Sequence, residues 1–128
     1  ACPRAERLRV DHGEAPARAR PWWRRWTGGE RALPVADLPA AAGDLLWANM
    51  GLHWQPDPLA EMRRWFRALA VDGILMFTTL GPGSLGALRA LYAARGWGEP
   101  FAPFVDMHDL GDMLVEAGFT DPVMDQEV

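Results

Sequence analysis

The chain has 128 residues, of which 49% are hydrophobic, and this is enough for one domain with an apolar core. The net charge of -4 argues against a nucleic-acid partner, and no stretch approaches the roughly 20 apolar residues of a membrane span, so we expect no membrane partner either. Cys2 is the only cysteine, which excludes an internal disulfide, and the charged N-terminus lacks a secretory signal, so we expect a cytoplasmic protein.

The first quarter of the chain is poorly patterned and rich in arginine. Residues 1–31 hold eight of the 13 basic residues, and residues 21–26 read PWWRRW. One interpretation is a patch for an anionic partner such as an acidic carrier protein. The other is a surface segment whose tryptophans pack on the domain and whose arginines are solvated. We therefore divide the chain into an N-terminal segment, 1–31, and an α/β domain, 32–128.

Residues 32–37 predict a short strand that ends in an acid. Asp37 follows the apolar positions of this strand, and residues 38–43 then turn the chain. A carboxylate just past a strand can accept a hydrogen bond from the amine or hydroxyl of a ligand. An aspartate at such a place also caps turns, and the sequence leaves both roles open.

Two apolar runs, 44–48 and 74–80, predict the central pair of strands. Near-continuous apolar runs are typical of parallel strands that are buried on both faces. Between them, apolar residues recur at helical spacing, and Asp57-Pro58 is a typical helix start. We expect the helix to end at Asp72-Gly73 and the strands to be parallel, joined by a right-handed crossover. The helical positions are Leu59, Met62, Phe66 and Leu69.

Two further helices are predicted after the second strand. Ser84 can cap a helix that ends near Gly96, and Asp106 can cap another that ends at Gly118. The aromatic loop 97–104 between them can act as a lid or simply cover the sheet. Residues 121–128 could begin a further strand.

The loop 49–54 lies at the carboxyl end of the first central strand, where open α/β sheets bind their ligands. His53 and Trp54 are therefore candidates for a pocket wall. The three histidines lack the spacing of a zinc site, and the loop Gly81-Pro82-Gly83 lacks the lysine of a phosphate-binding loop. The residues alone indicate an α/β domain with a ligand at the carboxyl ends of its strands.

Three segments carry a resemblance to a known family. Residues 44–54 (DLLWANMGLHW) resemble the fourth strand and following loop of class I S-adenosylmethionine-dependent methyltransferases. Together with FTTLGPGSLGALR at 77–89 and the segment 104–128, they resemble the biotin-synthesis malonyl-carrier-protein O-methyltransferases. The resemblance implies a Rossmann-like α/β fold, apparently incomplete here, with a mostly parallel sheet and helices on both faces. It also implies an enzyme that uses S-adenosyl-L-methionine to methylate the free carboxyl of a malonyl thioester carried by acyl carrier protein or CoA.

The resemblance also implies roles for individual residues, and it names no catalytic acid, base or metal ligand. Asp37 would accept a hydrogen bond from the adenine amine, and Leu38 would pack against the ring. The cofactor would be lined by Asn49, Met50 and Gly51. The substrate pocket would be formed by His53, Trp54, Thr79 and Arg89, where Arg89 either pairs with an acidic substrate or carrier or is simply solvated.

The chain also departs from the family pattern. The glycine-rich first loop has no match, Asp11 is only a weak candidate for the acid that binds the ribose hydroxyls, and the adenine segment is shortened to residues 37–39. These departures leave two alternatives. One is a methyltransferase-fold protein with other chemistry, such as an arginine hydroxylase of the complex I assembly type. The other is a non-catalytic binding module.

Overall fold

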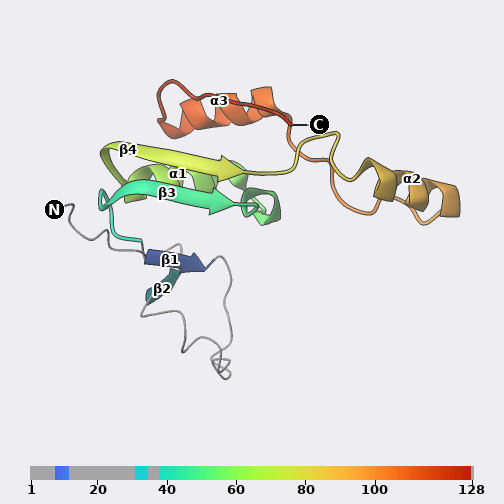
Figure 1. Cartoon of the computed structure of the whole chain (residues 1–128), viewed down its shortest axis with the longest axis horizontal. Helices are drawn as coiled ribbons and strands as arrows, with labels where there is room; N and C mark the ends of the chain where they lie inside the picture. Colours follow the sequence, from blue (N-terminus) through green and yellow to red (C-terminus); the bar gives the residue numbers. More distant parts are fainter. Residues whose placement is uncertain (1–7, 12–30, 35–37, 128) are drawn as a thin grey trace. The chain divides into compact units, whose positions relative to one another are not determined.

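The computed structural model describes residues 8–11, 31–34 and 38–127, and it divides into two compact units, 1–40 and 41–128. In the first unit, β1 (Leu8–Asp11) pairs in parallel with β2 (Arg31–Pro34). Figure 1 labels both strands. The strand expected at 32–37 thus begins one residue earlier, and its described part ends at Pro34. The strand β1 was not expected, because its four residues lie in the poorly patterned segment. Asp37 and the PWWRRW segment lie outside the described residues.

The second unit is built on the predicted strand-helix-strand crossover. It consists of β3 (Gly43–Asn49), the short helix η3 (Leu52–Trp54), α1 (Pro58–Ala68) and β4 (Leu69–Thr78). The strands β3 and β4 are parallel, with Leu46 opposite Leu75 and Ala48 opposite Phe77. This register confirms the predicted topology and fixes which side chains share a face of the sheet.

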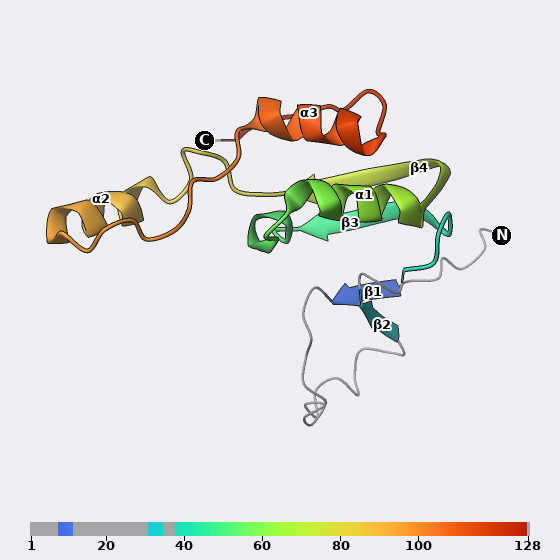
Figure 2. The ribbon, with the colours of Figure 1, turned by 180° about the vertical axis from the view of Figure 1, so that it is seen from behind.

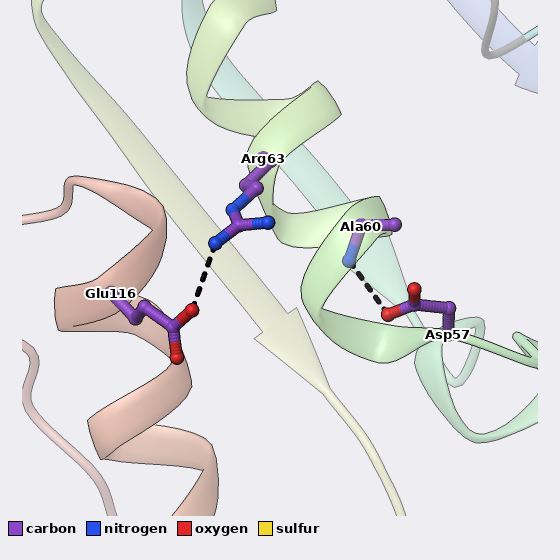
Figure 3. A network of polar contacts seen from close by, with 4 residues as sticks. All are labelled: Asp57, Ala60, Arg63 and Glu116. Carbon is purple, nitrogen blue, oxygen red and sulfur yellow. Dashed lines mark hydrogen bonds and ion pairs between the residues drawn. The ribbon is translucent and has the colours of Figure 1, made fainter.

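The start of α1 is confirmed, but its predicted end is wrong. The Asp57 carboxylate accepts a hydrogen bond from the Ala60 backbone N–H at 2.9 Å, with Pro58 as the first helical residue (Figure 3). The helix ends at Ala68, not at Asp72-Gly73, because Leu69 already pairs with Gly43 as the first residue of β4.

The residues expected to end the helix instead form an irregularity within β4. The register shifts between Gly43 and Leu45, and Asp72 adopts a φ of 63°, in the left-handed region. A Cβ at Gly73 would lie 2.9 Å from the carbonyl oxygens of both Ala70 and Gly43. Glycine is therefore required here by the close approach of two backbone segments, and not by a helix cap.

One face of the β3–β4 pair carries the core. The helix α1 lies behind the strands in Figure 1 and in front of them in Figure 2, and it packs on α3 (Met107–Ala117). Trp65 is the largest buried side chain among the described residues, 1% exposed, and its ring centroid lies 5.8 Å from that of Phe77 on β4. The buried cluster consists of Ala48, Leu52, Met62, Trp65, Leu110, Leu114 and Ala117.

The other face of the pair differs from the expectation of strands buried on both sides. Leu45 and Trp47 of β3 are 58% and 59% exposed, and Ile74 and Met76 of β4 are 59% and 46% exposed. Because Leu45 pairs with Ile74 and Trp47 with Met76, these four side chains form one apolar surface. The described residues therefore show helices on one face of this sheet.

The helix α2 (Gly86–Arg95) ends as predicted at Gly96, which has a φ of 65°. The predicted cap by Ser84 is wrong. Its hydroxyl instead accepts a hydrogen bond from the Gly81 N–H at 3.1 Å and so closes the preceding turn, while Leu85 takes the N-cap position without a side-chain hydrogen bond. None of the residues of α2 is buried.

The helix α3 follows the prediction at both ends. The Asp106 carboxylate accepts a hydrogen bond from the His108 backbone N–H at 2.9 Å, and Gly118 ends the helix with a φ of 110°. An ion pair of 2.8 Å between Arg63 and Glu116 joins α3 to α1 (Figure 3). Both of these side chains are mostly exposed, so the pair contributes little to stability.

The strand that could begin at residue 121 does not form over the described residues 121–127. Asp121 has a φ of 51°, and Pro122 follows it, so the backbone turns at this point. Met124 then packs against the core cluster. In the segment after α3, Met124 therefore adds to the core while Val123 is exposed.

We expect replacement of Trp65 by alanine to destabilise the protein by about 3–5 kcal/mol, because a large buried side chain leaves a cavity. Chemical denaturation measures the change. Trp54→Ala is the matched control, since Trp54 is 78% exposed and its removal leaves no core cavity. Equal losses for the two variants would contradict the assignment of Trp65 to the core.

The cap of α3 predicts a dependence of stability on pH. Hydrogen bonds from the backbone N–H and then from the side chain of His108 lower the pKa of Asp106. A lowered pKa stabilises the folded protein above the pKa of the unfolded aspartate, and this contribution is lost as the pH falls through the folded value. Asp106→Ala should therefore lower the melting temperature at pH 7 and have less effect near pH 3, a value of the order of the usual aspartate pKa.

Asp106→Asn is the control for this test, because asparagine caps helices without carrying a titratable charge. Its effect on the melting temperature should be smaller than that of alanine at pH 7. A penalty for Asp106→Ala that is the same at both pH values would show that the carboxylate charge has no part in the cap.

Candidate functional site

A hydrogen-bond network joins the carboxyl ends of β3 and β4. The Thr78 hydroxyl donates to the side-chain oxygen of Asn49 at 2.6 Å and accepts from the backbone N–H of Met50 at 3.1 Å. The same N–H lies 3.0 Å from the Thr78 carbonyl oxygen. The loop that leaves β3 is thus fixed to the end of β4.

The backbone turns sharply at this junction. Met50 has a φ of 51°, which non-glycine residues rarely adopt, and Gly51 is then the N-cap of η3. Leu52 is buried in the core and anchors the short helix, while Met50 and Trp54 remain exposed. The loop 49–51 carries no charged side chain, so it can contact a ligand only through its backbone, the Asn49 amide and apolar surface.

Four ring side chains, which we call the aromatic array, extend from η3. Trp54 and His53 have ring centroids 5.0 Å apart, and His53 meets Phe104 edge-on at 6.0 Å. Phe104 stacks on Phe101 at 4.8 Å with an interplanar angle of 19°. Aromatic pairs in these geometries attract one another. The array therefore connects η3 with the loop that follows α2.

Arg89 of α2 extends the aromatic array with a cation. Its guanidinium carbon lies 4.9 Å from the centroid of the Phe101 ring, which is cation–π geometry. Two polar atoms in this region are buried and have no hydrogen-bond partner among the described residues, namely Nε of Arg89 and Nδ1 of His53. Such atoms are unusual in folded proteins and are often explained by function or by an absent ligand.

The structure brings several of the predicted site residues together. His53, Trp54 and Arg89 are linked by the array, and Asn49 and Met50 are linked through Thr78. Thr79 is half-buried, just after β4. Leu38 is half-buried in the first unit, and Asp37 lies outside the described residues, so their predicted contact with adenine stays a prediction.

Three residues of the site were missed from the sequence. Thr78 makes the contacts that join the strand ends, while the prediction had named its neighbour Thr79. Phe101 and Phe104 complete the array. The aromatic composition of the loop 97–104 was the available signal, but composition did not indicate which residues the two phenylalanines would contact.

Within the described ranges 8–11, 31–34 and 38–127, no group of three or more histidine, cysteine, aspartate or glutamate residues is placed to hold a metal ion. A search of the same ranges finds no helix with the length and apolar character needed to cross a membrane.

No family model matches the chain. Among solved structures, it is similar to a protein from Thermotoga maritima described as a SAM-dependent methyltransferase, possible histamine N-methyltransferase. The TM-score is 0.57 at 19% identity, and the match covers 73% of this chain and 47% of the other. The chain therefore has the α/β fold of S-adenosylmethionine-dependent methyltransferases, as the sequence predicted.

Comparison with curated proteins shows which methyltransferases the chain resembles. Proteins named malonyl-(acyl-carrier protein) O-methyltransferase from Gallionella capsiferriformans and Laribacter hongkongensis are each 46% identical, over 112 and 101 residues. One of the same name from Legionella pneumophila is 36% identical over 107 residues. The matches cover 83%, 75% and 84% of this chain but only 39%, 34% and 38% of the relatives. The chain is thus homologous to a part of these methyltransferases, which confirms the resemblance found in the sequence.

Loss of the Thr78 hydroxyl should loosen the junction of the strand ends. We expect Thr78→Val to destabilise the protein by about 1–2 kcal/mol, since two hydrogen bonds disappear at nearly constant volume. Thr78→Ser keeps the hydroxyl and should retain most of the stability. Thermal denaturation measures both, and equal melting temperatures for the valine variant and the unaltered protein would rule out this role.

Proposed function

We propose that the protein that contains this chain is an S-adenosylmethionine-dependent methyltransferase that esterifies the free carboxyl of a malonyl thioester. The observation that carries the proposal is the 46% identity over 112 residues with a relative that bears the name of this activity. The methyltransferase fold of the chain supports it independently. The activity and partners are proposed for the whole protein, because the chain spans at most 39% of the relatives described above.

The described residues fit one part of the cofactor. Asn49, Met50 and Gly51 lie at the carboxyl end of β3, and the hydrogen bonds to Thr78 hold this uncharged loop in position. An uncharged loop suits the nucleoside portion of S-adenosylmethionine, which is bound through shape and backbone contacts. When bound, the cofactor supplies an electrophilic methyl group on a sulfonium.

In the first unit, Leu38 and Asp37 are proposed to contact adenine, with the aspartate accepting a hydrogen bond from the adenine amine. The carboxylate–amine pairing follows ordinary hydrogen-bond chemistry, because an ionised carboxylate is an acceptor and the amine a donor. The charged methionine portion of the cofactor has no partner in the loop 49–51.

The chemistry on the substrate side needs no general base. A carboxylic acid with an ordinary pKa near 4 is ionised at neutral pH and is already a nucleophile. The protein therefore contributes mainly by holding the reactants in line and by excluding water. A site of aromatic rings, a threonine and an arginine is compatible with this chemistry. The proposed pocket consists of His53, Trp54, Thr79 and Arg89.

The proposed partner is acyl carrier protein, or a CoA thioester that presents the same malonyl group. The arginine-rich sequence before residue 32 is a candidate binding segment for an acidic carrier, because its charge is opposite to that of the carrier. The relatives described above give no support to the arginine hydroxylase alternative. The non-catalytic module remains as an outcome of the following test.

Calorimetric titration of S-adenosylhomocysteine tests cofactor binding. We expect the whole protein to bind, because the demethylated cofactor keeps the nucleoside that the loop 49–51 is proposed to contact. Titration of the 128-residue chain alone then tells whether its own residues are sufficient. Failure of both to bind would refute the methyltransferase proposal.

Methyl transfer is measured by mass spectrometry of malonyl carrier protein incubated with the whole protein and S-adenosylmethionine. The expected product is a methyl ester. Acetyl carrier protein is the matched control, because it has the same thioester and lacks the free carboxyl. Cofactor binding without ester formation on the malonyl carrier would reject the substrate and leave a methyltransferase for another acceptor or a non-catalytic module.

A further inference from the structure

Arg89 is held by an aromatic ring and not by a carboxylate. Two other arginines of the second unit form ion pairs, Arg63 with Glu116 at 2.8 Å and Arg64 with Glu61 at 2.9 Å. Arg89 forms no ion pair with any described residue, and its Nε has no hydrogen-bond acceptor there. Its guanidinium carbon lies 4.9 Å from the Phe101 ring centroid. The ring therefore positions the cation, and no counter-charge comes from the part of the chain that the structure describes.

The geometry of a guanidinium determines which of its N–H donors can still bind a ligand when the group lies over a ring. Stacking uses the flat face of the group, whereas its five N–H donors point outward in the plane. These donors form a fork that matches the two oxygens of a carboxylate. Of these donors only Nε is buried without an acceptor among the described residues, and a water or a ligand atom can accept from it.

Arg89 is connected to the edge of the sheet at which β3 and β4 end. Both strand arrowheads in Figure 1 point toward the end of the unit where α2 lies. The aromatic array runs from Phe101 through Phe104 to His53 in η3, directly after the loop 49–51. Ligands of open α/β sheets bind beyond the carboxyl ends of the strands. A cation placed there can meet an acidic part of a ligand.

We propose that Arg89 selects acyl substrates that carry a free terminal carboxylate, and that Phe101 is the positioning residue that holds its guanidinium. The proposal rests on the proposed function and deepens it by naming the group that recognises the substrate. It has a consequence for the product. Esterification removes the negative charge, so the ester loses its partner and leaves, whereas the acid is retained.

The test compares the affinities of an acid and its ester. Calorimetry of the whole protein with bound S-adenosylhomocysteine gives dissociation constants for malonyl pantetheine thioester and for its methyl ester. We expect a preference for the acid of about 10- to 100-fold, the range of hydrogen bonds to charged groups. Arg89→Gln should abolish this preference, and Arg89→Lys should keep part of it as a point charge.

Two further variants distinguish the positioning of Arg89 by Phe101 from a general effect of positive charge on α2. Phe101→Leu should reduce the preference by about 2- to 30-fold, the range of a cation–π contact. Arg95→Gln is the matched control, because Arg95 lies on the same helix and also stacks on a ring, with its guanidinium carbon 5.3 Å from the Trp97 centroid. Its removal should leave the preference for the acid unchanged.

Several results would overturn the inference. They are equal binding of acid and ester by the unaltered protein, an unchanged preference in Arg89→Gln, or an equal loss in Arg89→Gln and Arg95→Gln. A merely structural role of Arg89 would lower the melting temperature and leave the ratio of the two affinities as it was. The affinity ratio is measured without turnover, so this inference can fail while methyl transfer persists, and methyl transfer can fail while the ratio stands.

Discussion

The packing of Trp65 against the β3–β4 pair is the constraint on which the second unit depends. A two-stranded parallel sheet has little stability alone, because its strands bury apolar surface only when another layer covers them. The helix α1 provides that layer, with Trp65 at its centre and Phe77 opposite. The helix α3 packs on α1 and adds Leu110, Leu114 and Ala117 to the same core. Since α1 also connects the two strands, they run parallel and their carboxyl ends lie together.

The candidate site arises from that placement. Thr78 joins the two strand ends, and its hydrogen bonds to Asn49 and Met50 hold the loop 49–51 in position. The aromatic array then connects this edge with α2, which buries none of its own residues. The candidate ligand-binding residues thus lie on loops that a pair of strands positions, as is common in α/β proteins. The proposed methyl transfer to a carboxylate is a reaction that depends on position more than on proton transfer.

The sequence was sufficient where structure is decided by neighbours in the chain. The starts of α1 and α3 follow from Asp57 and Asp106, each of which caps its helix within three residues. The ends of α2 and α3 follow from glycines that adopt a positive φ. The parallel crossover followed from two apolar runs separated by a helical pattern. The family resemblance added the fold and the expected activity, which residue patterns alone did not supply.

The tertiary structure decided the features that depend on distant partners. The end of α1 was mispredicted because Leu69 pairs with Gly43 rather than continuing the helix, and Ser84 closes a turn instead of capping one. The contact between Asn49 and Thr78 spans 29 residues, so only the folded chain could distinguish Thr78 from Thr79. The sequence by itself determined the local starts and stops and the order of the elements, because those rest on hydrogen bonds within one helical turn. The junction of the strand ends and the aromatic array required the tertiary structure, because packing brings their residues together from separate segments.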